Sequence, residues 1–595
     1  MVAIKLPTFA GMVPAIDKHL LADQNAQNSN NVWLYSGALV GLPAKAKLHD
    51  MADPAATVAF RVPINAADPT YLYNSYWKEF QNANTDFIAA PVQGDTFQRY
   101  YWTSTSEVPK YNTLARMQAN QPAWLLGLPQ PANINVVASG GSSSTLVSRA
   151  YLTTLVSAYG EEGPASNPFV INGKIDDNYT ITVGAVLAGD MGVNRNVSKI
   201  RIYRTITSAA GTATYYLVAE LNASTSTQNY VDNVSDAVLA SKPILESTAW
   251  TAPPQLQGMC VMPNGIIAGY IGKDLYFSEA YRPHAWPVAY SLSLDFEVVG
   301  MAVVNQTLVI CTKGTPYTAS GVNPASIITS KIASFEPCLS KGSIVPSDEG
   351  VYYTSPNGLI LCNAGFAQNL TKQYITRDKW NEIVNYGAVN AARFAGAYYA
   401  FGTGVVRAFD DTAFQNDAFQ MKTGTGASGG FLLDPQNANV GFTFMTETSD
   451  VVSVKNDMMS GEVLFVTNGA VYWLDQRPGF QVEPYKWRSK VFQTPELKNF
   501  SAMKTYFYDP TTPVTFITPE PNVSLNQVYD PAHQYAVVRI YADGKLIAAR
   551  ELRHSGQLLR LPSEYKAEFW EIEFEGIVKI KNFQMATSVK ELSVV

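Results

Sequence analysis

Short segments of alternating apolar and polar residues, separated by turn residues, run along most of the chain. In residues 199–205, Ile200 and Ile202 share one face of the expected strand. Arg201 and Tyr203 share the other face. Such alternation is typical of β-strands that bury one face. The pattern therefore predicts an all-β fold class without long helices.

A loose repeat of hairpins begins after residue 253. The expected hairpins start at 266, 307, 351, 397 and 463, and a period of about 40–50 residues is typical of β-propeller blades. The Gly-rich stretch 424–430 supplies the insertion that the last, longer spacing requires. Two hairpins are expected to turn on Asn357-Gly358 and Asn468-Gly469. The segments are 266–270 with 274–278, 307–312, 351–355 with 358–362, 397–401 with 405–409, and 463–467 with 470–474.

Further β domains are expected on both sides of these blades. Residues 124–145 contain a Ser/Gly run, which indicates a flexible connector. Five candidate strands between residues 146 and 232 then predict a sandwich of the immunoglobulin or fibronectin type, without the paired cysteines of a true immunoglobulin domain. After residue 483, a second group of strands predicts a terminal sandwich-like domain with a hairpin turn at Asp543-Gly544.

Four candidate strands precede the sandwich, at 57–62, 71–76, 87–90 and 97–103, and we expect them to form one antiparallel sheet. That sheet would be an early propeller blade; the alternative is an independent sheet. The chain is expected to comprise four parts: an N-terminal segment with the first blade or blades (1–135), an inserted sandwich (136–250), the remaining blades (251–483) and a C-terminal β domain (484–595).

Composition narrows the function classes. Charged residues make up 15 % of the chain, the formal net charge is −6, and no long run of Lys and Arg occurs. Proteins that grip DNA phosphates usually carry a concentrated basic surface, so the sequence argues against ordinary nucleic-acid binding. The sequence leaves open a role as a channel wall along which DNA slides. We find no signal-peptide pattern and no apolar run of about 18 residues, so synthesis in a cytoplasm is expected.

Motifs that could carry catalysis are weak. Residues 424–429 match the dinucleotide-binding pattern, and the overlapping residues 426–430, with Ser428, match a hydrolase nucleophile turn. Both chemistries need a helix directly after the turn, and the residues after Gly430 do not open one, so a flexible loop is expected. No residue is assigned a catalytic or cofactor-binding role, no cofactor is predicted, and the chain is expected not to be an enzyme.

The sequence supports metal binding no better than it supports catalysis. The five histidines show no HExxH pattern, and His284 lies in an aromatic, Pro-rich turn where a structural role is expected. Carboxylates such as Glu161-Glu162 are plentiful, but the sequence shows no pair placed across a cleft, as a glycosidase requires. The cysteines are too far apart for a CxxC site, so reduced thiols are expected and no metal ligand is assigned. They are Cys260, Cys311, Cys338 and Cys362.

Four sets of phrases follow one another along the chain. The first is Phe9-Ala10-Gly11-Met12-Val13-Pro14 with Asn31-Val32-Trp33-Leu34-Tyr35-Ser36-Gly37-Ala38-Leu39. The second is Tyr159-Gly160-Glu161-Glu162-Gly163-Pro164 with Arg201-Ile202-Tyr203-Arg204. The third is Asn264-Gly265-Ile266-Ile267-Ala268-Gly269, Phe277-Ser278-Glu279 and Pro283-His284-Ala285-Trp286-Pro287. The fourth is Trp487-Arg488-Ser489-Lys490 with Lys590-Glu591-Leu592. In this order they resemble a family of bacteriophage virion proteins, the tail nozzle or tail-tube proteins of short-tailed phages.

The resemblance spans most of the chain and implies a propeller-based, non-enzymatic structural subunit of the virion. It implies a ring, usually a homohexamer, that lies below the portal and adaptor and continues the channel for genome ejection. Expected partners are further copies of the chain, adaptor or portal-side proteins, and tail fibres or tailspikes. DNA would pass without sequence-specific binding, and the host envelope would be contacted indirectly. The expected location is the virion tail, after synthesis in the bacterial cytoplasm.

Two other functions remain open from the sequence. One is a carbohydrate-binding or receptor-binding propeller of the virion, and the other is a DNA-stabilising plug. A conduit must not hold phosphates tightly, because each tight Lys or Arg contact adds salt-dependent affinity. Its channel wall is therefore expected to carry the acidic surplus and only isolated basic residues.

Overall fold

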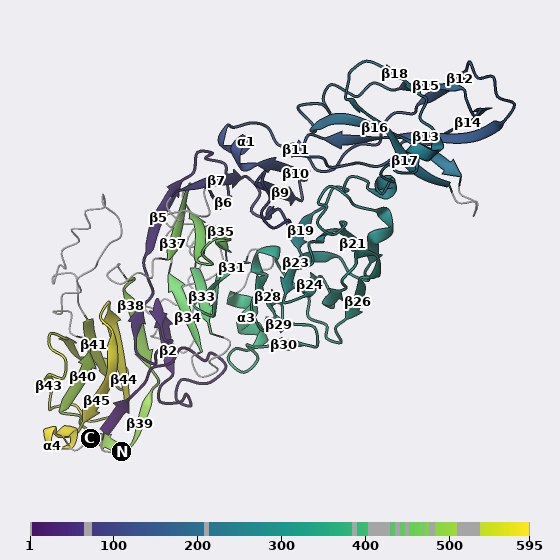
Figure 1. The fold of residues 1–595 in the computed structure, drawn as a ribbon. Helices are drawn as coiled ribbons and strands as arrows, with labels where there is room; N and C mark the ends of the chain where they lie inside the picture. The colour runs from purple at the N-terminus through teal and green to yellow at the C-terminus, as the bar shows by residue number, and fades with distance from the viewer. Residues whose placement is uncertain are drawn as a thin grey trace. The chain divides into compact units, whose positions relative to one another are not determined.

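The computed structural model describes residues 3–64, 74–207, 213–383, 389–402, 429–434, 441–446, 451–467, 469–474, 482–508 and 536–593. The chain divides into two units. Unit 1 comprises Met1–Arg61, Glu79–Ala83 and Glu336–Val595, and unit 2 comprises Val62–Lys78 and Asn84–Phe335. Regular structure in both units is almost entirely β, which confirms the predicted fold class (Figure 1). Among the described residues, no helix is both long enough and apolar enough to span a membrane.

Unit 2 contains three antiparallel sheets, each built from four consecutive strands. This arrangement is the blade of a β-propeller. The predicted hairpin at 266–278 and the predicted strand at 307–312 are confirmed as β20 with β21 and as β24. The first sheet has β8 (Asp86–Ala89), β9 (Arg99–Ser104), β10 (Glu107–Thr113) and β11 (Trp124–Leu125). The second has β19 (Gly258–Val261), β20 (Ile267–Ile271), β21 (Asp274–Phe277) and β22 (Ser291–Ser293). The third has β23 (Val298–Val304), β24 (Thr307–Thr312), β25 (Tyr317–Ser320) and β26 (Ile328–Lys331).

The early strands are grouped differently from the prediction. β6 (Val58–Pro63) and β7 (Ser75–Phe80) form a two-stranded sheet, whereas β8 and β9 pair with each other and continue into β10 and β11. The prediction of one sheet over 57–103 is therefore wrong. Alternation reveals where a strand lies, but it does not reveal where one sheet ends and the next begins.

The inserted sandwich of unit 2 has two facing sheets. One is β12-β15-β18 and the other is β14-β13-β16-β17. Ile200 and Ile202 lie in the core between the sheets, as the alternation predicts. The strands are β12 (Asn135–Ser139), β13 (Leu146–Ser157), β14 (Phe169–Lys174), β15 (Asn178–Val183), β16 (Val197–Thr207), β17 (Ala213–Asn222) and β18 (Gln228–Asp232).

The Ser/Gly run is not a tether in front of this sandwich, so the connector prediction is wrong. It joins β12 to β13 inside the domain. Asp176 accepts hydrogen bonds from the backbone N–H groups of Ser142 and Ser143 at 2.8–3.0 Å, and Asp177 accepts one from Gly141 at 2.8 Å. Carboxylates from the β14–β15 turn therefore order a segment whose composition alone suggests flexibility.

Apart from the four-stranded sheet β1-β45-β40-β43 of its C-terminal domain, unit 1 shows three more blade-like arrangements of four strands among its described residues. The hairpins β28–β29 and β36–β37 are confirmed at the predicted residues, whereas 405–409 lies outside the described residues. The N-terminal strand β5 (Lys45–Asp50) completes the sheet of β35, β36 and β37. The other strands are β27 (Val345–Pro346), β28 (Val351–Ser355), β29 (Gly358–Cys362), β30 (Ala367–Asn369), β31 (Val389–Phe394), β32 (Ala397–Gly402), β33 (Gly429–Leu433), β34 (Phe442–Thr446), β35 (Val451–Asn456), β36 (Val463–Thr467) and β37 (Ala470–Leu474).

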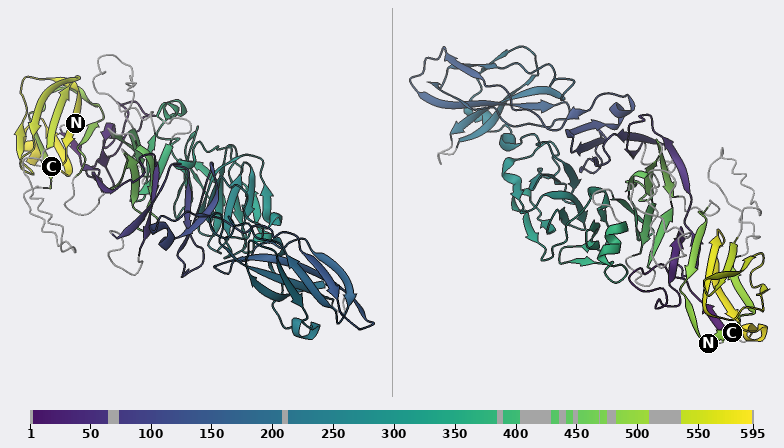
Figure 2. Two further views of the ribbon diagram at one scale, coloured as in Figure 1. Left: turned by 90° about the horizontal axis from the view of Figure 1, so that it is seen from above. Right: turned by 180° about the vertical axis from the view of Figure 1, so that it is seen from behind.

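The C-terminal β domain of unit 1 is completed by the start of the chain. Strand β2 (Ala26–Asn30) joins β34 to β38 (Tyr485–Ser489), so a ten-stranded sheet runs from β31 into the C-terminal strands. Strand β1 (Ala3–Leu6) pairs with β45 (Ile580–Ala586), and the two chain ends lie together there (Figure 2). The remaining strands are β39 (Phe492–Lys498), β40 (Ala502–Phe507), β41 (Ala536–Ala542), β42 (Lys545–Glu551), β43 (Leu558–Arg560) and β44 (Ala567–Gly576).

One predicted turn has a different loop. Ser355 pairs with Gly358, so the loop of that hairpin is Pro356-Asn357 rather than Asn357-Gly358. The turn at Asp543-Gly544 is confirmed, because both residues have the positive φ that such a hairpin needs (48° and 76°). The candidate strand at 514–517 lies outside the described residues.

Candidate functional site: a charge network at the base of the sandwich

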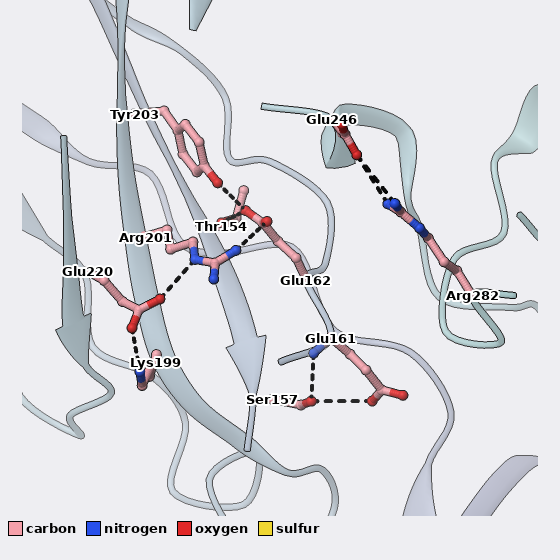
Figure 3. A network of polar contacts seen from close by, with 10 residues as sticks. All are labelled: Thr154, Ser157, Glu161, Glu162, Lys199, Arg201, Tyr203, Glu220, Glu246 and Arg282. Atoms are coloured by element: carbon pink, nitrogen blue, oxygen red, sulfur yellow. Dashed lines mark hydrogen bonds and ion pairs between the residues drawn. The ribbon is translucent and has the colours of Figure 1, made fainter. Parts of the chain in front are cut away.

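The best-connected polar cluster of unit 2 forms around adjacent carboxylates, Glu161 and Glu162. They lie in the segment between β13 and β14, just after the last residues of β13. The two side chains point in opposite directions, as consecutive residues of an extended segment do (Figure 3). Each carboxylate therefore meets a different part of the unit.

Glu162 faces the outer side of the β13–β16–β17 sheet. Its carboxylate accepts hydrogen bonds from Thr154 Oγ1 at 2.5 Å and from Tyr203 OH at 2.8 Å, and it pairs with Arg201 Nη1 at 2.8 Å (Figure 3). Arg201 Nε also donates to Glu220 at 2.9 Å, and Glu220 is paired with Lys199. Two negative and two positive side chains thus neutralise one another across this face.

Glu161 faces the first blade-like sheet of unit 2. Its Oε1 lies 2.6 Å from Arg99 Nη1, and Arg99 also holds Asp95 through two side-chain contacts of 3.0 and 3.1 Å. Ser157 Oγ donates to the second oxygen of Glu161 at 3.3 Å. Only 8 % of Glu161 is exposed, so this ion pair is shielded from water.

His284 brings a third segment to the cluster. Its Nδ1 lies 3.8 Å from Glu161 Oε1. Burial first, and then the positive charges of Arg282 and Arg99, lower the pKa of His284 to about 3. At neutral pH the ring is therefore uncharged, and its contact with Glu161 is not an ion pair.

Burial perturbs the other groups as well. It raises the pKa of Glu161, although Arg99 and the Ser157 hydroxyl act in the opposite direction. Burial alone would lower the pKa of Arg99, but its partners Asp95 and Glu161 outweigh that effect and raise it. Burial and then the Glu161 charge raise the pKa of Tyr101. The cluster thus keeps a buried cation between two carboxylates.

The segments that lead into and out of the sandwich meet beside this cluster. Gly127 has φ +80°, and a Cβ at this position would lie 2.6 Å from Ala252 Cα. A Cβ on Gly163 would lie 2.6 Å from Leu128. Arg195 donates to the carbonyl oxygen of Gly127. Backbone segments before and after the sandwich therefore touch without room for a side chain.

A contact at the surface holds the segment that follows the sandwich. Arg282 lies 4.1 Å from the ring centroid of Trp250. It also lies 3.4 Å from Glu246 (Figure 3). The Trp250 ring in turn meets His284 edge-on, with the ring centroids 6.0 Å apart. His284 lies in the Pro-rich turn of residues 281–287, between Trp250 and Glu161.

Both carboxylates of this cluster are already occupied by partners from the same unit. Both oxygens of Glu161 have partners, and the Glu162 carboxylate accepts from three side chains. The two glutamates stand out in the sequence as adjacent carboxylates, but no sequence pattern indicates Arg99 and Asp95 as their partners. Arg99 lies 62 positions from Glu161, so no local signal could have joined them.

The other candidate motifs are not brought together. Residues 424–428 lie outside the described residues, and Gly429–Leu433 forms strand β33 rather than a helix. Among the residues that the structure describes, no three His, Cys, Asp or Glu side chains gather as metal ligands would. The four cysteines are free thiols, and burial raises the pKa of Cys362 to about 12.

Comparisons with known proteins add little beyond the fold. No family model matches this chain, and no curated protein matches it. Among solved structures, Hsv2 of Kluyvelomyces marxianus is 9 % identical with a TM-score of 0.24, covering 52 % of this chain and 90 % of that one. The Pan2 WD40 domain of Neurospora crassa is 8 % identical with a TM-score of 0.22, covering 52 % and 87 %. The N-terminal domain of Nup159 is 10 % identical with a TM-score of 0.20, covering 46 % and 85 %. TM-scores this low add nothing to the sheets described above.

Proposed function

We propose that this chain is a structural subunit of a short-tailed phage virion, and that copies of it form a ring that conducts DNA during genome ejection. The proposed location is the virion tail. The proposed neighbours are further copies of the chain, adaptor or portal-side proteins, and tail fibres or tailspikes. The subunit acts mechanically and catalyses no reaction.

One observation carries this proposal: phrases that resemble the nozzle family lie far apart in the sequence but contact one another within each unit. In unit 2, the 159–164 phrase supplies Glu161 and Glu162, which contact Arg201 and His284 from two other phrases. In unit 1, the indole of Trp487 hydrogen-bonds Ala10 of the first phrase. The resembling residues thus join distant segments of the chain, as expected for a protein whose task is to keep a shape.

The test is to locate the subunit in purified virions by electron cryomicroscopy. We expect a ring of this chain around the tail axis, with six copies as the resemblance implies. A position on a radial fibre, together with glycan binding by the purified protein, would favour a receptor binder instead. A position inside the capsid, with tight DNA binding at moderate salt, would favour a DNA-stabilising plug.

A further inference from the structure

Two loops of the sandwich contact the first blade-like sheet of unit 2. Residues 158–168 join β13 to β14, and residues 184–196 join β15 to β16. The second loop also touches the segment that enters the sandwich, since Arg195 donates a hydrogen bond to the Gly127 carbonyl oxygen. The sandwich is therefore attached to its surroundings both by the two chain segments that enter and leave it and by these two loops.

Aromatic rings form the first contact. The ring of Tyr159 lies 4.4 Å from that of Phe97 and 6.0 Å from that of Trp124, measured between centroids. Phe97 lies just before β9 and Trp124 begins β11, so one side chain of the sandwich meets two parts of the sheet. The guanidinium of Arg116 lies 3.7 Å from the Trp124 ring centroid and holds that ring in place. Aromatic side chains have few rotatable bonds, so such contacts restrict movement at little cost in conformational entropy.

A buried ion pair lies beside these rings. Arg99 Nη1 lies 2.6 Å from Glu161 Oε1, and the guanidinium lies 5.8 Å from the Tyr159 ring centroid. Asp95 fixes Arg99 on the side of the sheet, and Ser157 fixes Glu161 on the side of the sandwich. The side chains of Arg99 and Glu161 are only 10 % and 9 % exposed. Separating them would leave the Glu161 charge unpaired and away from water, which is strongly unfavourable. The pair therefore resists displacement of the sandwich against the sheet.

Hydrogen bonds to the backbone form the second contact. The indole N–H of Trp124 donates to the carbonyl oxygen of Gly192 at 2.6 Å. The backbone N–H of Leu125 donates to the carbonyl oxygen of Asn194 at 2.8 Å. Both donors belong to β11, the last strand in the sheet β11-β10-β9-β8, so the sandwich loop pairs with the edge of this sheet. Because both acceptors are backbone groups, their positions do not depend on the side-chain rotamers of the loop.

We infer that the sandwich and the first blade-like sheet move as one rigid body, fastened by these two contacts. Domains joined only by linkers or by small interfaces usually move relative to each other. Here a rotation about either contact is opposed by the other. We call the two contacts together the clasp. It consists of Tyr159, Glu161, Gly192 and Asn194 of the sandwich with Phe97, Arg99, Trp124 and Leu125 of the sheet.

A fixed sandwich has a mechanical consequence. Whatever binds or pulls on this domain acts directly on the sheet beside it, because the clasp leaves no hinge between the two. A mobile receptor-binding arm would need the opposite, a joint that leaves the sandwich free to search its surroundings. The rigid joint is a property of a single chain, and it holds whether or not copies of the chain form a ring.

Double electron–electron resonance on the full chain measures the spread of distances between two spin labels, and a rigid joint gives a narrow distribution. Asn172→Cys places one label on the sandwich and Ala89→Cys places the other on the sheet, because both residues are exposed. Cys260→Ser removes the partly exposed native thiol, and the other three cysteines are buried. We expect one narrow peak for the wild-type clasp. It should stay narrow at about 1 M NaCl, because salt screens exposed charges far more than buried pairs.

Two variants weaken the clasp in steps. Glu161→Gln removes the charge across the joint with little change in size, and Phe97→Ser/Glu161→Gln also removes an aromatic contact. The distribution should widen in the first variant and reach about twice the wild-type width in the second, because the buried ion pair and one ring contact are then both lost. The matched control is Glu162→Gln, which should keep the wild-type width. The side-chain partners of Glu162 all lie on sandwich strands, namely Thr154, Arg201 and Tyr203.

Several outcomes would overturn the rigid body. They are a broad or multi-peaked distribution for the wild-type clasp, its widening at high salt, and an unchanged width in Phe97→Ser/Glu161→Gln. Equal widening in Glu162→Gln would also count against the clasp. If the double variant loses its β-type circular dichroism spectrum, Glu161→Gln alone must widen the distribution for the inference to stand. Failure of any of these measurements would leave the proposed ring untouched, because they concern one chain in solution.

Discussion

The indole N–H of Trp487 donates a hydrogen bond of 2.9 Å to the backbone carbonyl of Ala10, although 477 positions separate the two residues. The Trp487 side chain is fully buried, and the Phe9 ring packs edge-on against it with the centroids 5.0 Å apart. Two of the phrases that resemble the nozzle family thus form one joint. This joint fastens the first residues of the chain to strand β38.

Replacing Trp487 by Phe should loosen that joint. The substitution leaves the Ala10 carbonyl without its buried donor, which costs about 1–3 kcal/mol. Hydrogen–deuterium exchange should rise in residues 9–30. The control is Trp570→Phe, because Trp570 is equally buried but donates to Ala567, only three positions away. If both variants leave exchange of residues 9–30 unchanged, the bond does not hold this segment.

The stability of unit 2 should fall as the pH falls below about 6.5. His284 is neutral in the folded chain because its pKa is lowered to about 3, while the unfolded chain takes up a proton near pH 6.5. Between these values the unfolded state binds more protons, so stability falls with falling pH, by at most about 1.4 kcal/mol per pH unit. The raised pKa of Glu161 acts in the opposite direction above its unfolded value.

The variant His284→Gln separates the two effects, because glutamine does not titrate. Its unfolding temperature by calorimetry should depend less steeply on pH between 5 and 7 than that of wild type. The exposed His554 provides the control, and His554→Gln should follow wild type. A His284→Gln profile parallel to wild type would show that this histidine does not govern the acid response.

Gly127→Ala should be costly at the base of the sandwich. The new Cβ would meet Ala252 Cα at 2.6 Å with φ at +80°, so we expect a loss of about 2–4 kcal/mol. Gly94 has a similar φ of +69° but open space around its Cβ position, so Gly94→Ala should cost only about 1 kcal/mol. Calorimetric unfolding of both variants isolates the close approach of the two backbone segments. Equal losses would mean that the approach is readily relaxed.

The inserted sandwich should fold alone only when β12 is present. A fragment of residues 129–250 contains all seven strands, and we expect cooperative unfolding with a β-type circular dichroism spectrum. A fragment of residues 146–245 lacks β12, so β15 loses one of its two neighbours and exposes part of the core. It should unfold at a clearly lower temperature. Equal midpoints for the two fragments would contradict this assignment of β12.

Sequence patterns located strands well and their partners poorly. The hairpin 463–474 was predictable because its strands β36 and β37 follow each other closely in the sequence and pair with each other. The pairing of β1 with β45 was not, because partners at opposite ends of the chain leave no local periodicity. The ordering of the Ser/Gly run by the Asp176 side chain was not predictable either, because composition alone marks this run as flexible.

The position of unit 2 within the sequence of unit 1 has a consequence for biosynthesis. Strands β2 and β5 leave the ribosome early, but their partners β38 and β37 follow more than 400 residues later. At about 5–20 residues per second, these early strands wait roughly 20 to 90 seconds with unpaired edges. Unit 2 is nearly continuous and can fold during that interval. Prematurely terminated chains would keep these strand edges unpaired, and unpaired edges favour aggregation.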